Sequence, residues 1–270
     1  MTVSQSKEGA ITIAGRTFED PLAEALRIID LADGAGLQVR LMGGLAFHAR
    51  APEWTARIDR SGRDIDLATR SKDRNALAAL LITEGYVPDR HYNAAFGHKQ
   101  LYFTDPAWER PVDVLVDRLE MCHRLEFAGR LSVDRPTLPL AELLMSKLQV
   151  VRINRKDILD LLILLQEYPL AVDDRDGISL PRVVAHTSTD WGWWRTVTEN
   201  LAKLDLYVDE ELRDDDLDTG RPPRFDLHAQ IADLQVAIDA APKSTRWKLR
   251  ARVGDKVAWY ESPEEVGHGH

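Results

Sequence analysis

Residues 38–50 place the strongest constraint on how this chain of 270 residues can fold. Gln38-Val-Arg-Leu-Met42 is typical of a short strand, and it runs directly into Gly43-Gly44, after which a helical apolar pattern covers residues 45–50. Two glycines between a strand and a helix allow close backbone approach, and the free amides at a helix start suit a phosphate. A lone Gly-Gly pair is more often a simple turn, so whether this pair indicates a phosphate site depends on the neighbouring segments.

The neighbouring segments predict a small mixed sheet with helices against it. Apolar residues at helical spacing or in alternation indicate the type of each segment. We expect helices over residues 21–37 and 73–84, and strands over residues 63–70, 98–104 and 111–116. This order of elements predicts an α+β fold, in which a small mixed β-sheet core has flanking helices.

The pattern changes to helices after Pro139. We expect a domain boundary near residues 136–139, with a sheet-containing core over 1–136 and a mainly helical C-terminal domain over 137–270. A dense group of indoles, Trp191, Trp193 and Trp194, is expected to pack the helical core or its junction with the first domain. The expected helices cover residues 140–153, 156–168, 180–185, 191–206 and 225–240.

Composition narrows the class of protein. The net charge of −9 argues against a surface that binds nucleic acid as a whole, although one local basic stretch stands out. A single cysteine, Cys122, excludes an internal disulfide framework and a cysteine-rich zinc site. With no leader pattern and no apolar run of membrane-spanning length, we expect a cytoplasmic protein with no membrane partner. The basic stretch comprises Arg50, Arg57, Arg60, Arg63, Arg70, Lys72 and Arg74.

Three acidic residues in predicted strands are candidates for chemistry. In Asp64-Ile-Asp66 the strand period places both carboxylates on one face, where they can share a divalent cation. Asp113 interrupts an apolar strand, and a buried carboxylate there is costly unless it is paired or metal-bound. Asp117 has the same parity as Asp113, so it is the alternative third carboxylate or a residue that merely ends the strand.

Together these motifs resemble the core of the DNA polymerase β-like nucleotidyltransferases. The resemblance rests on Gly43-Gly44-Leu-Ala-Phe, Arg63-Asp64-Ile-Asp66-Leu and Val112-Asp113-Val. Within that superfamily the chain is similar to the AbiEii/MenT-type toxin nucleotidyltransferases, and its Gly-Gly form is similar to the aminoglycoside nucleotidyltransferases. The stretches Glu142-Leu-Leu-Met-Ser-Lys147 and Arg155-Lys156-Asp157-Ile-Leu-Asp160 look like the AbiEii-type helix pair. Many superfamily members have Gly-Ser in place of Gly43-Gly44, so one hydroxyl contact to a phosphate is absent here.

The resemblance implies a Mg²⁺-dependent transfer of an NMP from an NTP to a hydroxyl acceptor, with two metal ions. Asp64 and Asp66 would be metal ligands, and Asp113 would complete a second metal position or activate the acceptor hydroxyl. The residues implied to bind the nucleotide are Gly43, Gly44, Arg63 and Lys147.

Other functions fit parts of the pattern. The acceptor could be a tRNA, a small molecule such as an aminoglycoside, or a protein side chain, and the toxin group implies an antitoxin partner. A catalytically inactive chain could serve as a nucleotide sensor or protein-interaction module, although it need not have kept three acids. A metal-dependent phosphohydrolase ranks last, because no His-Asp pair or H-x-H motif lies near the carboxylates.

Overall fold

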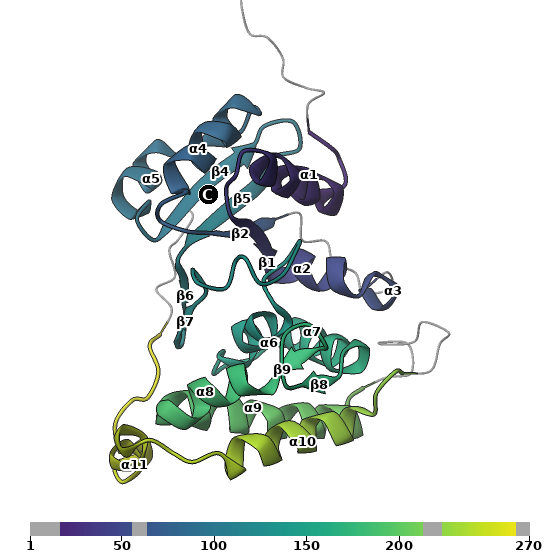
Figure 1. Cartoon of the computed structure of the whole chain (residues 1–270), viewed down its shortest axis with the longest axis vertical. Helices are drawn as coiled ribbons and strands as arrows, with labels where there is room; N and C mark the ends of the chain where they lie inside the picture. Colours follow the sequence, from purple (N-terminus) through teal and green to yellow (C-terminus); the bar gives the residue numbers. More distant parts are fainter. Residues whose placement is uncertain (1–16, 56–63, 213–222, 263–270) are drawn as a thin grey trace, which may run out of the picture.

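The computed structural model describes residues 17–55, 64–212 and 223–262. In this part of the chain a five-stranded sheet with its helices forms the upper half of Figure 1, and a layer of helices forms the lower half. The expected α+β class with a mixed sheet is therefore confirmed. The boundary near residues 136–139 stays a prediction.

The sheet runs in the order β1-β2-β5-β4-β3, where β2 and β5 are parallel and the other neighbours are antiparallel. One face is apolar and buried: α1 contacts β1 and β2 there, and α4 lies beside α1. Along β4 and β5 buried and half-buried residues alternate, as expected for a sheet with one covered face. The elements of this half are α1 (Pro21–Gly34), β1 (Val39–Met42), α2 (Gly43–Arg50), α3 (Pro52–Thr55), β2 (Ile65–Thr69), α4 (Arg74–Thr83), β3 (Val87–Pro88), α5 (Arg90–Phe96), β4 (Gln100–Asp105), β5 (Arg110–Val116), β6 (Arg118–Glu120) and β7 (Arg124–Glu126).

Helices dominate the second half, as the sequence predicts. The main helices occur in the predicted order, although α6 ends at Leu148 and not at residue 153. The sequence patterns missed the shorter elements α3, β3, α5, the β6–β7 hairpin, β8, β9 and α11. Within the described ranges, no helix has both the length and the apolar character needed to cross a bilayer. The elements are α6 (Leu140–Leu148), α7 (Arg155–Glu167), β8 (Leu170–Ala171), β9 (Ile178–Ser179), α8 (Leu180–Thr189), α9 (Trp191–Glu210), α10 (Leu227–Ala240), α11 (Thr245–Ala251) and a short 3-10 helix (Gly254–Lys256).

The segment that joins the two halves is bound to the edge of the sheet. Leu41 donates its backbone N–H to the carbonyl of Pro136 and accepts one from Leu138, both at 2.9 Å. The Arg50 guanidinium donates to the Thr137 hydroxyl at 2.7 Å. Because β1 leads directly into α2, these bonds fix the connecting segment beside the start of that helix.

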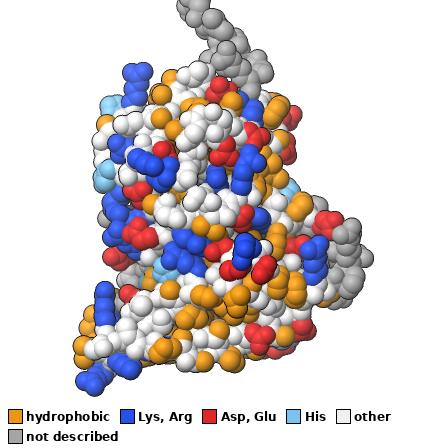
Figure 2. All heavy atoms as spheres, viewed as in Figure 1, with side chains coloured by type: hydrophobic (Ala, Val, Ile, Leu, Met, Phe, Trp, Pro, Cys, Tyr) orange, Lys and Arg blue, Asp and Glu red, His pale blue; other side chains and the backbone are white. Residues whose placement is uncertain are grey.

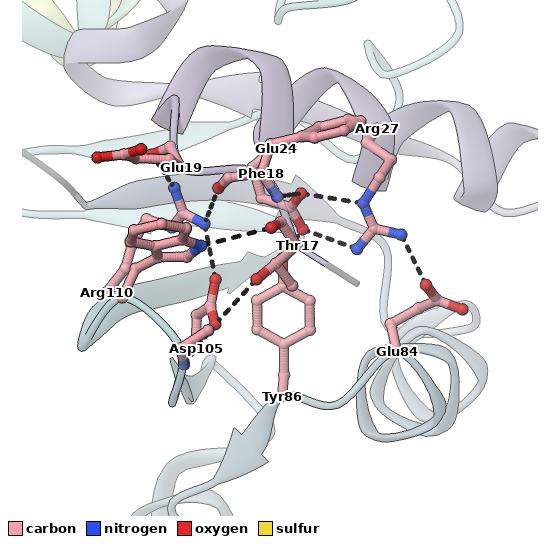
Figure 3. A network of polar contacts seen from close by, with 11 residues as sticks. Thr17, Phe18, Glu19, Glu24, Arg27, Glu84, Tyr86, Asp105 and Arg110 are labelled. Carbon is pink, nitrogen blue, oxygen red and sulfur yellow. Dashed lines mark hydrogen bonds and ion pairs between the residues drawn. The ribbon is translucent and has the colours of Figure 1, made fainter. Parts of the chain in front are cut away.

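A buried polar network ties α1 to the sheet (Figure 3). The Glu24 carboxylate is fully buried and accepts hydrogen bonds from the Arg27 guanidinium, the Tyr86 hydroxyl and the backbone N–H of Phe18. Arg27 also reaches Glu84, at the end of α4, at 2.6 Å. A buried carboxylate with this many donors is stable where an unpaired one would not be.

The same network includes a second buried ion pair on the sheet (Figure 3). Arg110 is 1% exposed and contacts the Asp105 carboxylate at 2.6 Å. Its guanidinium also donates to the backbone carbonyls of Phe18 and Glu19 at 2.8 and 3.1 Å. The segment before α1 is thus held against β4 and β5.

We predict that Tyr86→Phe lowers the free energy of unfolding by about 1–2 kcal/mol, because it leaves the buried Glu24 carboxylate one donor short. Urea denaturation measures the change. The control is Asp173→Asn, which breaks an exposed pair with Arg175 and should leave stability unchanged. Equal stability of Tyr86→Phe and wild type would contradict the role given to the network.

Candidate functional site

Two carboxylates lie side by side on the sheet. Asp66 of β2 is the register partner of Asp113 in the parallel strand β5, and neighbouring strands lie about 4.8 Å apart. Both residues are half-buried, whereas their neighbours Ile65, Val112 and Val114 are fully buried on the opposite face. The two acids therefore share the open face of the sheet.

Gly43 approaches the Asp66 carboxylate more closely than a residue with a Cβ could. Its φ is +62°, a conformation that favours glycine, and a Cβ at this position would lie 1.8 Å from Oδ2 of Asp66. Met42, the residue before it, is the register partner of Asp66 across β1 and β2. The start of α2 is thus packed directly against the Asp66 carboxylate, as the predicted junction of strand, glycine and helix requires.

The charge of the site affects Asp66 strongly. The pKa of Asp66 is raised to about 7, first by burial and then by the carboxylates of Asp113 and Asp64, while Lys147 acts in the opposite direction. Asp64 is exposed and lies directly before β2. The same two neighbours, after burial, raise the pKa of the Tyr102 phenol, so Asp64 and Asp113 act on one region. The site therefore has more negative charge than its surroundings neutralise.

A short chain of hydrogen bonds orients Asp113. The Gln100 side-chain amide donates to Oδ1 of Asp113 at 2.5 Å, and the Tyr92 hydroxyl donates to Oε1 of Gln100 at 3.0 Å. Sequence reasoning missed both residues. The polar positions Gln100 and Tyr102 in β4 alternate with buried residues, so they could have been placed on the face of Asp113.

Lys147 of α6 is near the site but is already held by α7. Its ammonium group contacts the carboxylates of Asp157 at 2.6 Å and Asp160 at 3.2 Å, and it lies 5.7 Å from the centre of the Phe47 ring in α2. Asp157 and Asp160 are thus engaged in ion pairs with Lys147. Lys147 is close enough to lower the pKa of Asp66, so the helical half contributes positive charge to the site.

Asp117 lies at the end of β5 in a different setting. Its φ is +65°, its carboxylate accepts the backbone N–H of Ser71 at 2.9 Å, and its carbonyl accepts the N–H groups of Phe127 and Ala128. These contacts shape the turn after the strand. The geometry thus places Asp113, and not Asp117, beside Asp66. Arg63 lies outside the described residues.

The donor set suits a hard divalent cation, because carboxylate oxygens are the ligands that Mg²⁺ prefers. In the described part of the chain, no group of three or more His, Cys, Asp or Glu side chains is already arranged to hold a metal ion. Asp66 and Asp113 form an adjacent pair, and Asp64 is the third carboxylate close by.

Searches of protein-family models and of curated proteins gave no match to this chain. Several solved structures match it, among them the following two. An antigenic nucleotidyltransferase-like protein from Paracoccidioides brasiliensis has a TM-score of 0.40 and 13% identity, covering 85% of this chain and 96% of that chain. The STING-associated CdnE c-di-GMP synthase from Capnocytophaga granulosa has a TM-score of 0.29 and 12% identity, covering 81% and 80%. Similarities this weak carry no argument about activity.

We predict that Gly43→Ala disrupts the site and destabilises the protein. The control is Gly36→Ala, because Gly36 has a similar φ of +73° but open space around its Cα. The strain of a positive φ alone costs about 1–2 kcal/mol, so the loss of stability in Gly36→Ala measures this strain without a collision. Urea denaturation should show a larger loss for Gly43→Ala, and equal losses would contradict the collision with Asp66.

A second prediction follows from the raised pKa of Asp66, which is about 7 in the folded protein against an ordinary value of 3.8. Between these values the folded state binds more protons, so stability falls as pH rises and then levels off above pH 7. Without divalent cations, Asp66→Asn should therefore stabilise the protein more at about pH 8 than at about pH 5. Urea denaturation measures the difference in free energy of unfolding between Asp66→Asn and wild type. The same difference at both pH values would contradict the raised pKa.

Proposed function

We propose that this protein is a Mg²⁺-dependent nucleotidyltransferase that moves an NMP from an NTP to a hydroxyl acceptor. The observation that supports this most is the contact of Gly43 with Asp66, beside Asp113. It brings a helix start, which suits phosphate, together with carboxylates, which suit the cation that accompanies a triphosphate.

In this proposal α2 binds the triphosphate. The helix begins at Gly43, and Met42 before it makes no side-chain cap hydrogen bond. The first backbone N–H groups of a helix have no partner within it, and the helix dipole favours an anion there. Gly43 and Gly44 have no side chain to keep a phosphate away from these groups.

Asp64, Asp66 and Asp113 would hold Mg²⁺, which supplies charge stabilisation for the attacking and leaving oxygens. The acceptor hydroxyl oxygen attacks the α-phosphorus, the bond from that phosphorus to the bridging oxygen breaks, and pyrophosphate leaves. In its alternative role, Asp113, which accepts a hydrogen bond from Gln100, would take the proton of the hydroxyl. Lys147 offsets part of the negative charge of the centre.

The acceptor would enter along β4 and β5. Leu115 follows Asp113 by two residues on the same face and pairs with Gln100, and both line a cavity of about 500 Å³ together with Tyr92. Because Gln100 bonds to Asp113, this cavity begins beside the proposed reaction centre. The resemblance makes a tRNA end or a small molecule the candidate acceptors, and it makes an antitoxin a candidate partner.

Calorimetric titration of the four ribonucleoside triphosphates with Mg²⁺ tests the donor site. We expect wild type to bind at least one of them in a metal-dependent way, and Asp64→Ala/Asp66→Ala to lose that binding. If the folded wild type binds none of the four, the result contradicts the enzymatic proposal and favours a non-catalytic interaction protein.

A matched pair of variants tests which carboxylate completes the centre. Asp113→Asn should lower metal-dependent triphosphate turnover by about a thousandfold or more, because a carboxylate at the reacting atoms is lost. Asp117→Asn removes an equal charge four residues away and should leave turnover within about threefold. Pyrophosphate release measures both, and the reverse ranking would show that Asp117 is the third carboxylate.

A further inference from the structure

A larger cavity lies away from the carboxylate centre. Its volume is about 880 Å³, and it lies between the β6–β7 hairpin, the start of α9, α11 and the C-terminal residues 258–261. None of Asp64, Asp66 and Asp113 lines it. Sites for small organic ligands typically have volumes of about 300–1,000 Å³, so the space is sufficient for one.

Aromatic rings form much of its wall. Trp193, 5% exposed, stacks on the His123 ring at 4.9 Å, and Trp191 meets Trp259 edge-on at 6.2 Å. Burial lowers the pKa of His123 to about 4, so this imidazole is neutral at neutral pH. Trp259 is further fixed by a hydrogen bond from its indole N–H to the Thr196 hydroxyl. Beside it, Tyr260 is half-buried and lines the cavity.

Two guanidinium groups at the cavity have no carboxylate partner among the described residues. Arg250 lies 4.7 Å from the centre of the Trp191 ring and donates to the carbonyls of Gly254 and Val257, which hold it in place. Arg246 is exposed and makes no ion pair within the described ranges. Both arginines come from α11, and the charge of neither is paired with a carboxylate of the described residues.

The carboxylates at the cavity are mostly engaged elsewhere. Glu120 is paired with Lys99 at 2.8 Å and with Arg118, and Asp190 accepts the first N–H groups of α9. Glu261 is at the exposed edge. Arg124, the third arginine of the lining, is paired with Glu126, so Arg246 and Arg250 are the cations of the lining that no described carboxylate pairs with.

The surface next to the cavity is basic, in contrast to the chain as a whole. Residues 243–256 contain six Lys or Arg and one acid, in a protein of net charge −9. Figure 2 shows Lys and Arg side chains gathered at the lower-left corner, where Figure 1 places α11. The basic residues are Lys243, Arg246, Lys248, Arg250, Arg252 and Lys256.

We propose that this cavity binds a nucleotide unit, with its base against Trp259 and Tyr260 and its phosphate at Arg246 and Arg250. Aromatic faces stack on bases of any type, and guanidinium groups bind phosphate through paired N–H donors. The combination selects a ligand that is both flat and anionic. This binding is separate from the proposed transfer reaction and needs neither the metal nor the three carboxylates.

Such a unit has two sources, a free nucleotide or the end of a single-stranded nucleic acid. The second source has a path: the two cavities share Glu120 and Glu261 in their linings, and the smaller one reaches Gln100 beside Asp113. A strand held in the larger cavity could extend toward the carboxylates, and its backbone could lie on α11.

The test is a tryptophan-fluorescence titration of Asp64→Ala/Asp66→Ala with a metal chelator, so that the donor site is silent. AMP represents the free nucleotide, and a short single-stranded oligonucleotide represents the strand. Each is titrated into this protein and into versions that also carry Arg246→Glu or, as a matched control, Lys248→Glu. Lys248 is exposed on the same helix and does not line the cavity.

We expect Arg246→Glu to weaken binding by about tenfold or more, and Lys248→Glu by less than about threefold, because Arg246 is one of the two proposed phosphate ligands and Lys248 is not. Tyr260→Leu should also weaken binding, since it removes a stacking face. Binding of AMP assigns the site to free nucleotides, and binding of the oligonucleotide alone assigns it to a strand end. The proposal is overturned if neither AMP nor the oligonucleotide binds. It is also overturned if Arg246→Glu and Lys248→Glu weaken binding equally.

Discussion

The contact between Gly43 and the Asp66 carboxylate is the constraint on which the rest of the site depends. A positive φ and the absence of a Cβ let α2 start within reach of a carboxylate, where any other residue would collide with it. The antiparallel pairing of β1 with β2 fixes this contact, and the parallel pairing of β2 with β5 adds Asp113. Three strands and one helix start thus converge on one point.

Burial and the neighbouring carboxylates both make the charged form of Asp66 unfavourable in the absence of a cation, so its pKa is raised to about 7. The surrounding structure maintains the arrangement. The buried Glu24 and Arg110 networks anchor α1 and the segment before it to the sheet, and the connecting segment is bonded to β1. Lys147, positioned by α7, supplies the positive charge that lowers the pKa of Asp66, so both halves of the molecule contribute to one site.

Local pattern was enough to predict the order of the main elements and the strands that carry two of the candidate acids. Alternation in residues 63–70 and 111–116 placed Asp66 and Asp113 on strands, and Gly43 marked the turn. The sequence could not show that Asp113 rather than Asp117 neighbours Asp66, because register between distant strands depends on tertiary packing. Short elements such as α5 and the β6–β7 hairpin have too little periodicity to be predicted.

The polar partners of the site residues could not be predicted from the sequence either. Gln100 orients Asp113, and Asp157 holds Lys147, through contacts that depend on how strands and helices pack in space. The cavity beside α11 is formed by segments separated by more than a hundred residues. Trp193 was expected to pack in a core or at a junction; it is buried and stacks on His123, between β6 and β7.

The most direct test of the central claim is a crystal structure of the protein with Mn²⁺ and a non-hydrolysable triphosphate, with the metal located by anomalous scattering. We expect a metal peak between Asp66 and Asp113, and phosphate oxygens at the first backbone N–H groups of α2. A triphosphate bound elsewhere, or no metal peak at these carboxylates, would contradict the account.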